Sequence, residues 1–310
     1  MCTLSIDIVV ATYKRNSFLP DLCSSILKLM GENDRLYVVS QCNSSGEISS
    51  DPRLHLSNLN QANLPLARNA GITAGCGDII LFLDDDVVCG SALLEKHRQV
   101  YTDCTIGAVA GFVDDPLFTT GSVCPSRIDI TTGECIQNFS VAQSQDAISV
   151  MGANMSFSRR ALSNAGMFDP NFKKNALWED VDMAFRIREA GYRIWYCSEA
   201  KVKHLRAAEG GCRTQHSFMY IYHLFANTAY FLHKHSKYRF TRKLYSFWWH
   251  RLEYLTRMPD GKLVQHNPLL VMAGLIGWCA GVLRYLKVCI KRNKGLLPKK
   301  LLTQESLPCV

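Results

Sequence analysis

Short apolar runs alternate with amphipathic stretches through the first 110 residues. The apolar runs are rich in β-branched residues and predict buried strands at 6–11, 36–39, 79–83 and 107–113, with a weaker strand at 53–56. Between them, capping residues and apolar positions at helical spacing predict helices at 17–30, 65–70 and 92–101. Strands that alternate with helices are typical of an α/β protein, in which helices flank a mostly parallel twisted sheet.

The pattern changes in the second hundred residues. Residues 114–147 show little periodicity, and we interpret them as a loop-rich insertion. Beyond this insertion the pattern predicts a strand at 149–157, a helix at 159–165, a turn at 168–172, a helix at 180–190, and strands at 193–197 and around Val202. The α/β pattern therefore extends to about residue 205.

Three adjacent aspartates, Asp84, Asp85 and Asp86, end the strand predicted at 79–83. In an extended chain Asp84 and Asp86 point to the same side. Two carboxylates about 4 Å apart repel by roughly 4 kcal/mol at an effective dielectric constant near 20, and a divalent cation relieves that repulsion. The cluster indicates a Mg²⁺ or Mn²⁺ site, and a solvated acidic loop tip is the alternative.

Polar residues also follow the first two predicted strands. Thr12, Tyr13 and Arg15 follow the first strand, and Gln41 follows the second. Ligands of doubly wound sheets bind beyond the carboxyl ends of the strands. We therefore expect these residues to share one crevice with the three aspartates.

A second acidic cluster opens the helix predicted at 180–190. Glu179 and Asp180 are adjacent, and Asp182 follows two residues later. Acidic side chains at a helix N-terminus interact favourably with the helix dipole, which is one explanation of the cluster. The other is a general base, because a carboxylate at the start of a helix is fixed in direction. The neighbouring Trp178 offers either a stacking face for a sugar or an anchor in the core.

A single histidine follows both acidic clusters. His204 shares one face of an extended segment with Val202, while Lys201 and Lys203 point to the other side. Two interpretations stay open for His204, a structural side chain or a metal ligand.

Charge divides the chain into two parts. The net charge is +8, but residues 1–200 hold 16 basic and 23 acidic residues, whereas residues 201–310 hold 19 and 4. The basic region suggests contact with an anionic surface, and we favour a membrane over nucleic acid because no nucleic-acid-binding module accompanies the charge. The 13 cysteines form no C-x-x-C pair and no basic signal segment opens the chain, so we expect a cytoplasmic protein at the cytosolic face of a membrane.

Residues 206–310 form a basic, aromatic-rich region that we expect to be helical. Aromatic and basic residues interleave at 243–257, and 269–283 is an uncharged run of 15 residues. A helix of that length rises about 22 Å, less than the roughly 30 Å of a bilayer core, so we expect an interfacial helix. Gly277 and Gly281 have the spacing of a helix-packing motif. The alternative is a helical subdomain that packs on the sheet or forms a homo-oligomer.

Taken together, these motifs resemble the inverting glycosyltransferases of family 2, which have the GT-A fold. The resemblance covers residues 5–204 and supports a catalytic domain at 1–205, followed by the C-terminal region at 206–310. The motifs lie at 8–15, 66–71, 83–86, 152–157 and 178–182, followed by Arg186, Gly191 and His204. Each is weak alone, but their order and spacing make the resemblance specific.

The resemblance implies a metal-dependent enzyme that uses a nucleotide-sugar donor, most often a UDP-sugar, and a glycan or lipid-linked acceptor. Its implied donor contacts are Thr12, Tyr13, Arg15, Gln41, Arg68, Asn69, Asp84 and Asp85. The implied ligands of Mn²⁺ or Mg²⁺ are Asp86, His204 and Asp84, the base is Asp180, and the acceptor contacts are Asn154, Trp178 and Glu179. A sugar nucleotidyltransferase and a non-catalytic nucleotide-sugar-binding protein are the alternatives. The former needs a glycine-rich phosphate loop after the first strand, and residues 11–15 contain no glycine.

Overall fold

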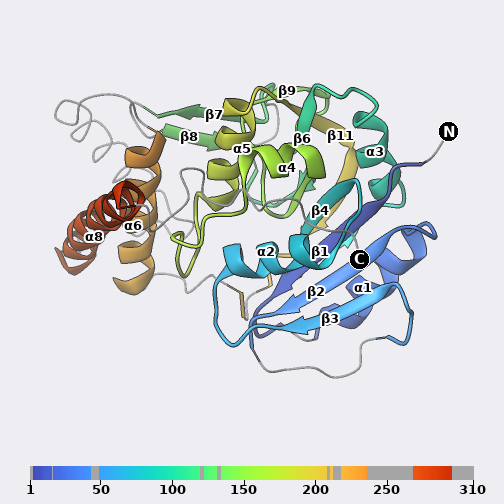
Figure 1. The fold of residues 1–310 in the computed structure, drawn as a ribbon, viewed down its shortest axis with the longest axis horizontal. Helices are drawn as coiled ribbons and strands as arrows, with labels where there is room; N and C mark the ends of the chain where they lie inside the picture. Colours follow the sequence, from blue (N-terminus) through green and yellow to red (C-terminus); the bar gives the residue numbers. More distant parts are fainter. Residues whose placement is uncertain are drawn as a thin grey trace.

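A nine-stranded sheet forms the centre of the described chain (Figure 1). The computed structural model describes residues 3–15, 17–42, 49–118, 122–130, 134–207, 210–211, 218–235 and 268–294. The strands of the sheet are β1 Ile6–Thr12, β2 Arg35–Ser40, β3 Leu54–Asn58, β4 Ile79–Asp84, β5 Val87–Cys89, β6 Ile106–Asp114, β9 Gln145–Ala147, β10 Asn154–Ser158 and β11 Arg193–His204. They lie in the order β3-β2-β1-β4-β10-β6-β11-β5, and β9 pairs with β11.

The sheet is mostly parallel, as expected from the sequence. Strands β3, β2, β1 and β4 pair in parallel, and β6 pairs in parallel with β11. Strand β10 runs antiparallel between β4 and β6, and β5 and β9 run antiparallel to β11. A separate two-stranded sheet pairs β7 Ser126–Asp129 with β8 Glu134–Gln137.

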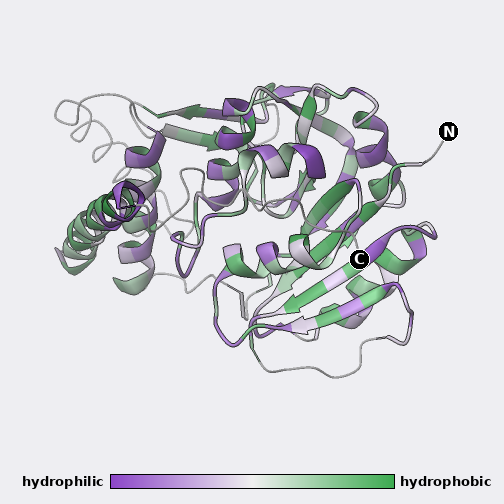
Figure 2. Cartoon of the chain, in the orientation of Figure 1, coloured by the Kyte–Doolittle hydropathy of each residue, from purple (hydrophilic) through white to green (hydrophobic). Residues whose placement is uncertain are grey.

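Helices cover both faces of the sheet. The described helices are α1 Leu19–Leu29, α2 Leu64–Ala74, α3 Leu93–Val100, α4 Arg159–Ala165, α5 Glu179–Glu189, α6 Phe218–His235 and α8 Pro268–Asn293, of which α6 and α8 pack against each other. In Figure 1, α2, α4 and α5 lie on the viewer's side of the sheet. Figure 2 shows mainly hydrophobic residues along the central strands, in keeping with burial between two helical layers.

Several local expectations were wrong. The helices predicted at 17–30 and 92–101 begin later, α1 at Leu19 and α3 at Leu93, and neither has a side-chain cap. The interval 114–147, predicted to be loop-rich, also contributes the short strands β7, β8 and β9. Strand β10 begins at Asn154, later than expected, and β11 is one strand with a register shift between Cys197 and Lys201.

Strand pairing explains why the acidic residues meet. Ala11 at the end of β1 lies opposite Asp84 at the end of β4. The chain then turns into β5, where Val87 lies opposite His204 of β11. The short strand β5, which sequence patterns missed, therefore brings His204 back to the three aspartates.

The two C-terminal helices α6 and α8 pack side by side (Figure 1). A side chain at Gly277 would collide with the backbone oxygen of Tyr222, and one at Gly281 with that of Ala226. The two glycines with the spacing of a helix-packing motif thus face α6 of the same chain. Small residues allow two helix backbones to approach closely.

Helix α8 is longer than the 15-residue apolar run from which its length was predicted. It has 26 residues, and by length and composition it could cross a membrane. The argument that this helix is too short for a bilayer was therefore wrong. Figure 2 shows α8 to be hydrophobic along most of its length. The aromatic and basic stretch at 243–257 lies outside the described residues.

Candidate active site

Asp84, Asp86 and His204 form a compact group of metal-ligating side chains. One ligand atom from each lies within 4.8 Å of the others. Asp86 and His204 are buried, whereas Asp84 is partly exposed. Two carboxylates and an imidazole are a donor set that suits Mn²⁺ and related divalent ions. The predicted metal ligands thus lie together.

Asp115 supports this group through His204, and sequence reasoning missed it. Its Oδ2 lies 2.8 Å from Nδ1 of His204, while Nε2 of His204 lies 3.3 Å from Oδ1 of Asp86. Burial lowers the pKa of His204, but the hydrogen bonds that its ring donates to the carboxylates of Asp115 and Asp86 outweigh burial and raise that pKa to about 9. The signal was available, since Asp115 follows the end of β6 as Asp86 follows the end of β4.

The side chains after β1 bind the aspartates directly. Thr12 Oγ1 donates a 2.8 Å hydrogen bond to Asp85 Oδ2, and Arg15 donates one of 2.8 Å to Asp85 Oδ1. Arg15 also lies 3.1 Å from Asp86 Oδ2. Because these groups are buried, Thr12, Arg15 and Asp85 together hold the loop that carries the metal-ligating pair. A direct contact of these three residues with the donor stays a prediction.

Arg68 joins the two acidic clusters. It pairs with Glu179 and lies 3.7 Å from Asp84 Oδ1. Its guanidinium stands over the rings of Phe82 and Phe168, at 5.8 and 5.5 Å from their centroids. The side chain is 3 % exposed, so both acidic clusters border one buried cation.

Asp180 lies at the start of α5, next to Glu179. Its Oδ2 accepts a 3.1 Å hydrogen bond from Gly152 N–H, and its Oδ1 accepts one of 2.8 Å from Val181 N–H. Burial raises the pKa of Asp180 above its ordinary value, the charge of Arg68 opposes this rise, and the charge of Asp84 adds to it. A carboxylate with a raised pKa is a stronger base.

Three predicted ligand contacts have other roles in the structure. Asn69 Nδ2 donates a 2.8 Å hydrogen bond to the backbone oxygen of Phe168, and Asn69 Oδ1 accepts one of 2.8 Å from the Phe168 N–H. Asn154 is 0 % exposed and bonds His97 and two backbone oxygens. Trp178 is buried against Phe231, with ring centroids 4.6 Å apart. These polar groups and ring faces are used inside the protein, and contacts of the three residues with a donor or an acceptor stay predictions.

Tyr13 and Gln41 lie at the strand ends, where they were expected. Gln41 N–H and Nε2 both donate to the oxygen of Thr12, at 2.9 and 3.4 Å. Tyr13 is partly buried and its oxygen accepts a 2.8 Å hydrogen bond from Gly211 N–H. Their contact with a donor stays a prediction.

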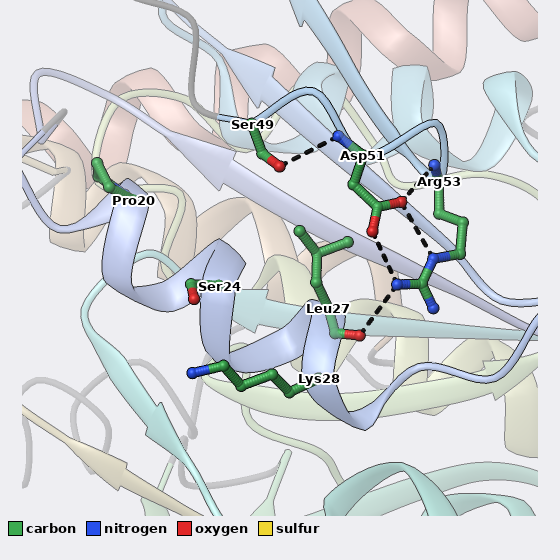
Figure 3. A pocket seen from close by; sticks show the side chains of 7 residues that line it. All are labelled: Pro20, Ser24, Leu27, Lys28, Ser49, Asp51 and Arg53. Atoms are coloured by element: carbon green, nitrogen blue, oxygen red, sulfur yellow. Dashed lines mark hydrogen bonds and ion pairs between the residues drawn. The ribbon is translucent and has the colours of Figure 1, made fainter.

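A separate pocket lies between α1 and the start of β3 (Figure 3). It is lined by Pro20, Ser24, Leu27, Lys28, Ser49, Asp51 and Arg53. Arg53 is held there by Asp51 at 2.8 Å and by the backbone oxygen of Leu27 at 3.3 Å (Figure 3). No residue of the two acidic clusters lines this pocket, so we do not assign it to the candidate active site.

Comparison with known proteins defines the class to which this protein belongs. Residues 5–220 match glycosyltransferase-like family 2, and the chain belongs to this family. The protein is therefore a glycosyltransferase with the GT-A fold, as the motifs predicted. No curated protein matches the sequence.

Solved structures share the fold at low sequence identity. A mannosyltransferase from Pyrobaculum calidifontis, PcManGT, in complex with GDP-Man and Mn²⁺, is 15% identical, with a TM-score of 0.55 over 96% of this chain and 82% of the other. S. aureus TarS 1-349, in complex with UDP-GlcNAc, is 13% identical, with a TM-score of 0.57 over 96% and 93%. GalNAc-T7 with UDP, GalNAc and Mn²⁺ is 12% identical, with a TM-score of 0.57 over 86% of this chain and 58% of its own.

Proposed function

We propose that the protein transfers a sugar from a nucleoside-diphosphate sugar to an acceptor hydroxyl with inversion at the anomeric carbon. The observation that carries this proposal is the position of Arg68, which contacts Asp84 on one side and Glu179 on the other. A donor diphosphate at the first cluster and an acceptor at the second would then meet in one crevice. The nucleotide-sugar complexes of PcManGT and TarS support the class of donor.

The ligand atoms of Asp84, Asp86 and His204 suit a divalent cation both in their chemical type and in their spacing. They would hold Mn²⁺ or Mg²⁺, which supplies Lewis-acid stabilisation of the departing diphosphate. Arg15 and Thr12 keep the aspartate loop in place, and Asp115 fixes the ring of His204. Hydrogen bonds between side chains of the protein thus fix the geometry of the site.

Asp180 acts as the base in this proposal. Its hydrogen bond from Gly152 fixes the carboxylate, and its raised pKa favours acceptance of the acceptor's proton. Such a base contributes roughly 10²–10⁴-fold to the rate. Glu179 Oε2 is buried and accepts no hydrogen bond from the described residues, so it is available to an acceptor hydroxyl. Displacement by that hydroxyl from the face opposite the diphosphate inverts the configuration.

The experiment is a screen of UDP-, GDP- and dTDP-sugars for thermal stabilisation and for metal-dependent turnover with Mn²⁺ or Mg²⁺. We expect donors with one of the three nucleobases to stabilise the protein, and only with the metal present. Asp180→Asn should keep donor binding and abolish transfer. Absence of stabilisation by every donor contradicts the proposal, and turnover by Asp180→Asn removes the base assignment.

We also propose that α8 attaches the enzyme to the cytosolic face of a membrane, where a lipid-linked or growing glycan is the acceptor. The side of α8 away from α6 exposes Leu269, Met272, Leu275, Ile276, Leu283, Leu286 and Ile290. Basic residues Lys287, Lys291, Arg292 and Lys294 follow at its end and favour anionic lipid, at about 1 kcal/mol each.

Sedimentation with phosphatidylcholine vesicles, with and without phosphatidylglycerol, tests this attachment. The full chain should sediment with anionic vesicles, and the variant Leu275→Gln with Leu283→Gln should not. If the full chain stays in solution, the membrane proposal is contradicted. If the full chain instead dimerises with rising concentration and the variant Leu275→Gln with Leu283→Gln does not, the exposed apolar side of α8 binds a second copy.

A further inference from the structure

Three residues with left-handed backbone precede the helix that carries Glu179 and Asp180. Lys174, Ala176 and Trp178 have φ angles of 60°, 50° and 78°, and none of them is glycine. Left-handed backbone is unfavourable for residues with a Cβ atom and persists only where surrounding contacts hold it. Some part of the molecule must therefore hold the segment 173–178.

The side chain of Asn227 on α6 makes those contacts. Its Nδ2 donates hydrogen bonds of 3.0 Å to the oxygen of Lys173 and of 2.9 Å to Oδ1 of Asn175. Its Oδ1 accepts bonds of 3.3 Å from Lys173 N–H and of 2.8 Å from Arg284 of α8. Asn227 is 0 % exposed and uses the full hydrogen-bonding capacity of an amide.

The residue next to it fixes the far end of the same segment. Thr228 Oγ1 accepts a 2.8 Å hydrogen bond from Nε1 of Trp178. Phe231, one turn further along α6, stacks on the Trp178 ring. The segment is therefore held by α6 at its beginning and at its end.

Two successive backbone turns connect Asn227 to the acidic cluster. Ala176 N–H donates to the oxygen of Lys173, which Asn227 also binds, and Glu179 N–H donates to the oxygen of Ala176, at 3.2 and 3.1 Å. Asp180 follows directly in the first turn of α5. Movement at Lys173 would thus be transmitted to the direction of both carboxylates.

We propose that Asn227 is a positioning residue for sugar transfer, because its amide holds residues 173–175 in the conformation that directs Asp180 towards the acceptor. This inference rests on the proposed function, in which Asp180 is the base. It gives the C-terminal helices a part in the reaction that is separate from attachment to a membrane.

The test compares Asn227→Ala with Tyr230→Phe in the full chain. Tyr230 also joins α6 to the body of the protein, through a 2.8 Å hydrogen bond to Asp169, but this bond does not reach residues 173–178. In Asn227→Ala, kcat for transfer should fall roughly 10²-fold, the size of effect that a small misplacement of reacting groups produces, while KM for the donor changes less than about twofold. Amide hydrogen exchange should accelerate in 173–182 and stay unchanged in 79–84. Tyr230→Phe should keep kcat within about a factor of two.

Asn227→Asp provides a second variant in case the alanine variant does not fold. It keeps the acceptor for Arg284 and removes both donated bonds, so the same losses are expected. Unchanged exchange in 173–182, unchanged kcat, or an equal loss of kcat in Tyr230→Phe each overturns the inference. If Asp180→Asn retains transfer, the base assignment fails separately, and the exchange measurement still decides whether Asn227 holds the segment.

Discussion

His204 and Asp115 are joined by a 2.8 Å hydrogen bond between Nδ1 and Oδ2, and both side chains are buried. This bond leaves Nε2 of His204 directed towards Asp86, at 3.3 Å. A carboxylate behind a metal-ligating imidazole fixes its tautomer and its orientation. The candidate metal site therefore involves Asp84, Asp86, His204 and Asp115, of which Asp115 has no predicted contact with a metal.

Asp115→Asn should weaken the binding of Mn²⁺ about 10–100-fold, since the ring of His204 loses its orienting carboxylate. Titration calorimetry with Mn²⁺ measures the effect directly. Asp114→Asn is the matched control, because Asp114 is exposed and adjacent in sequence. Equal Mn²⁺ affinity in both variants would show that Asp115 does not support the site.

His97 should make the stability depend on pH. It is buried between Asn154 and Ser156, at 2.9 and 2.8 Å from its two ring nitrogens, and burial lowers its pKa from 6.5 to about 4. In the unfolded chain His97 is therefore protonated below about pH 6.5, whereas in the folded chain it is protonated only below about pH 4. The free energy of unfolding should be unaffected above pH 6.5 and fall by about 3 kcal/mol between pH 6.5 and 4.

Urea unfolding at pH 7.5, 6 and 5 measures how steeply the free energy of unfolding changes with pH. His97→Gln keeps a polar side chain and has no titrating group, so part of the slope should vanish with it. A slope that is identical in wild type and His97→Gln would contradict the assignment to His97.

Lys234 should be important for stability, although it lies outside the predicted catalytic domain at 1–205. Its Nζ lies 2.8 Å from Asp169 and 2.7 Å from Asp182, and both carboxylates are fully buried. Removing one partner of a buried ion pair leaves an uncompensated charge, at a cost of about 3–5 kcal/mol. Lys234→Met should lower the free energy of unfolding by that amount, as measured in urea, whereas Lys203→Met, at an exposed lysine, should change it by less than about 0.5 kcal/mol. Equal stability of the two variants would show that the buried carboxylates do not need Lys234.

Local patterns predicted much of the sheet. The core strands β1, β2, β4 and β6 are short apolar runs, and their alternation with helices predicts the parallel pairing of β1 with β4. Asp84 ends β4 and Asp86 lies two residues further on, so a rule about strand ends was sufficient to place both carboxylates at the crevice. His204 was implied only by the resemblance to the family, because the strand β5 that brings it to the aspartates was not predicted.

Contacts between distant segments were not predictable in this way. Asn69 and Asn154 lie in motifs that suggest ligand binding, yet their amides bond backbone of the same protein. The sequence carries no sign of which partner a buried amide will meet. The same limit hid Asn227, which reaches Lys173 across 54 positions of the chain.

The glycines of α8 should be essential for its packing on α6. At Gly277 an added methyl group would collide with the backbone oxygen of Tyr222, which cannot move aside as a side chain can. Gly277→Ala should therefore lower the stability of the helix pair by about 1–3 kcal/mol, despite the better helix propensity of alanine. At Gly274 the nearest atom is 3.3 Å away, on the ring of Phe225, so Gly274→Ala should be close to neutral. Hydrogen exchange within 218–235 and 268–294 measures both variants, and equal protection in the two would show that the close approach at Gly277 is not required.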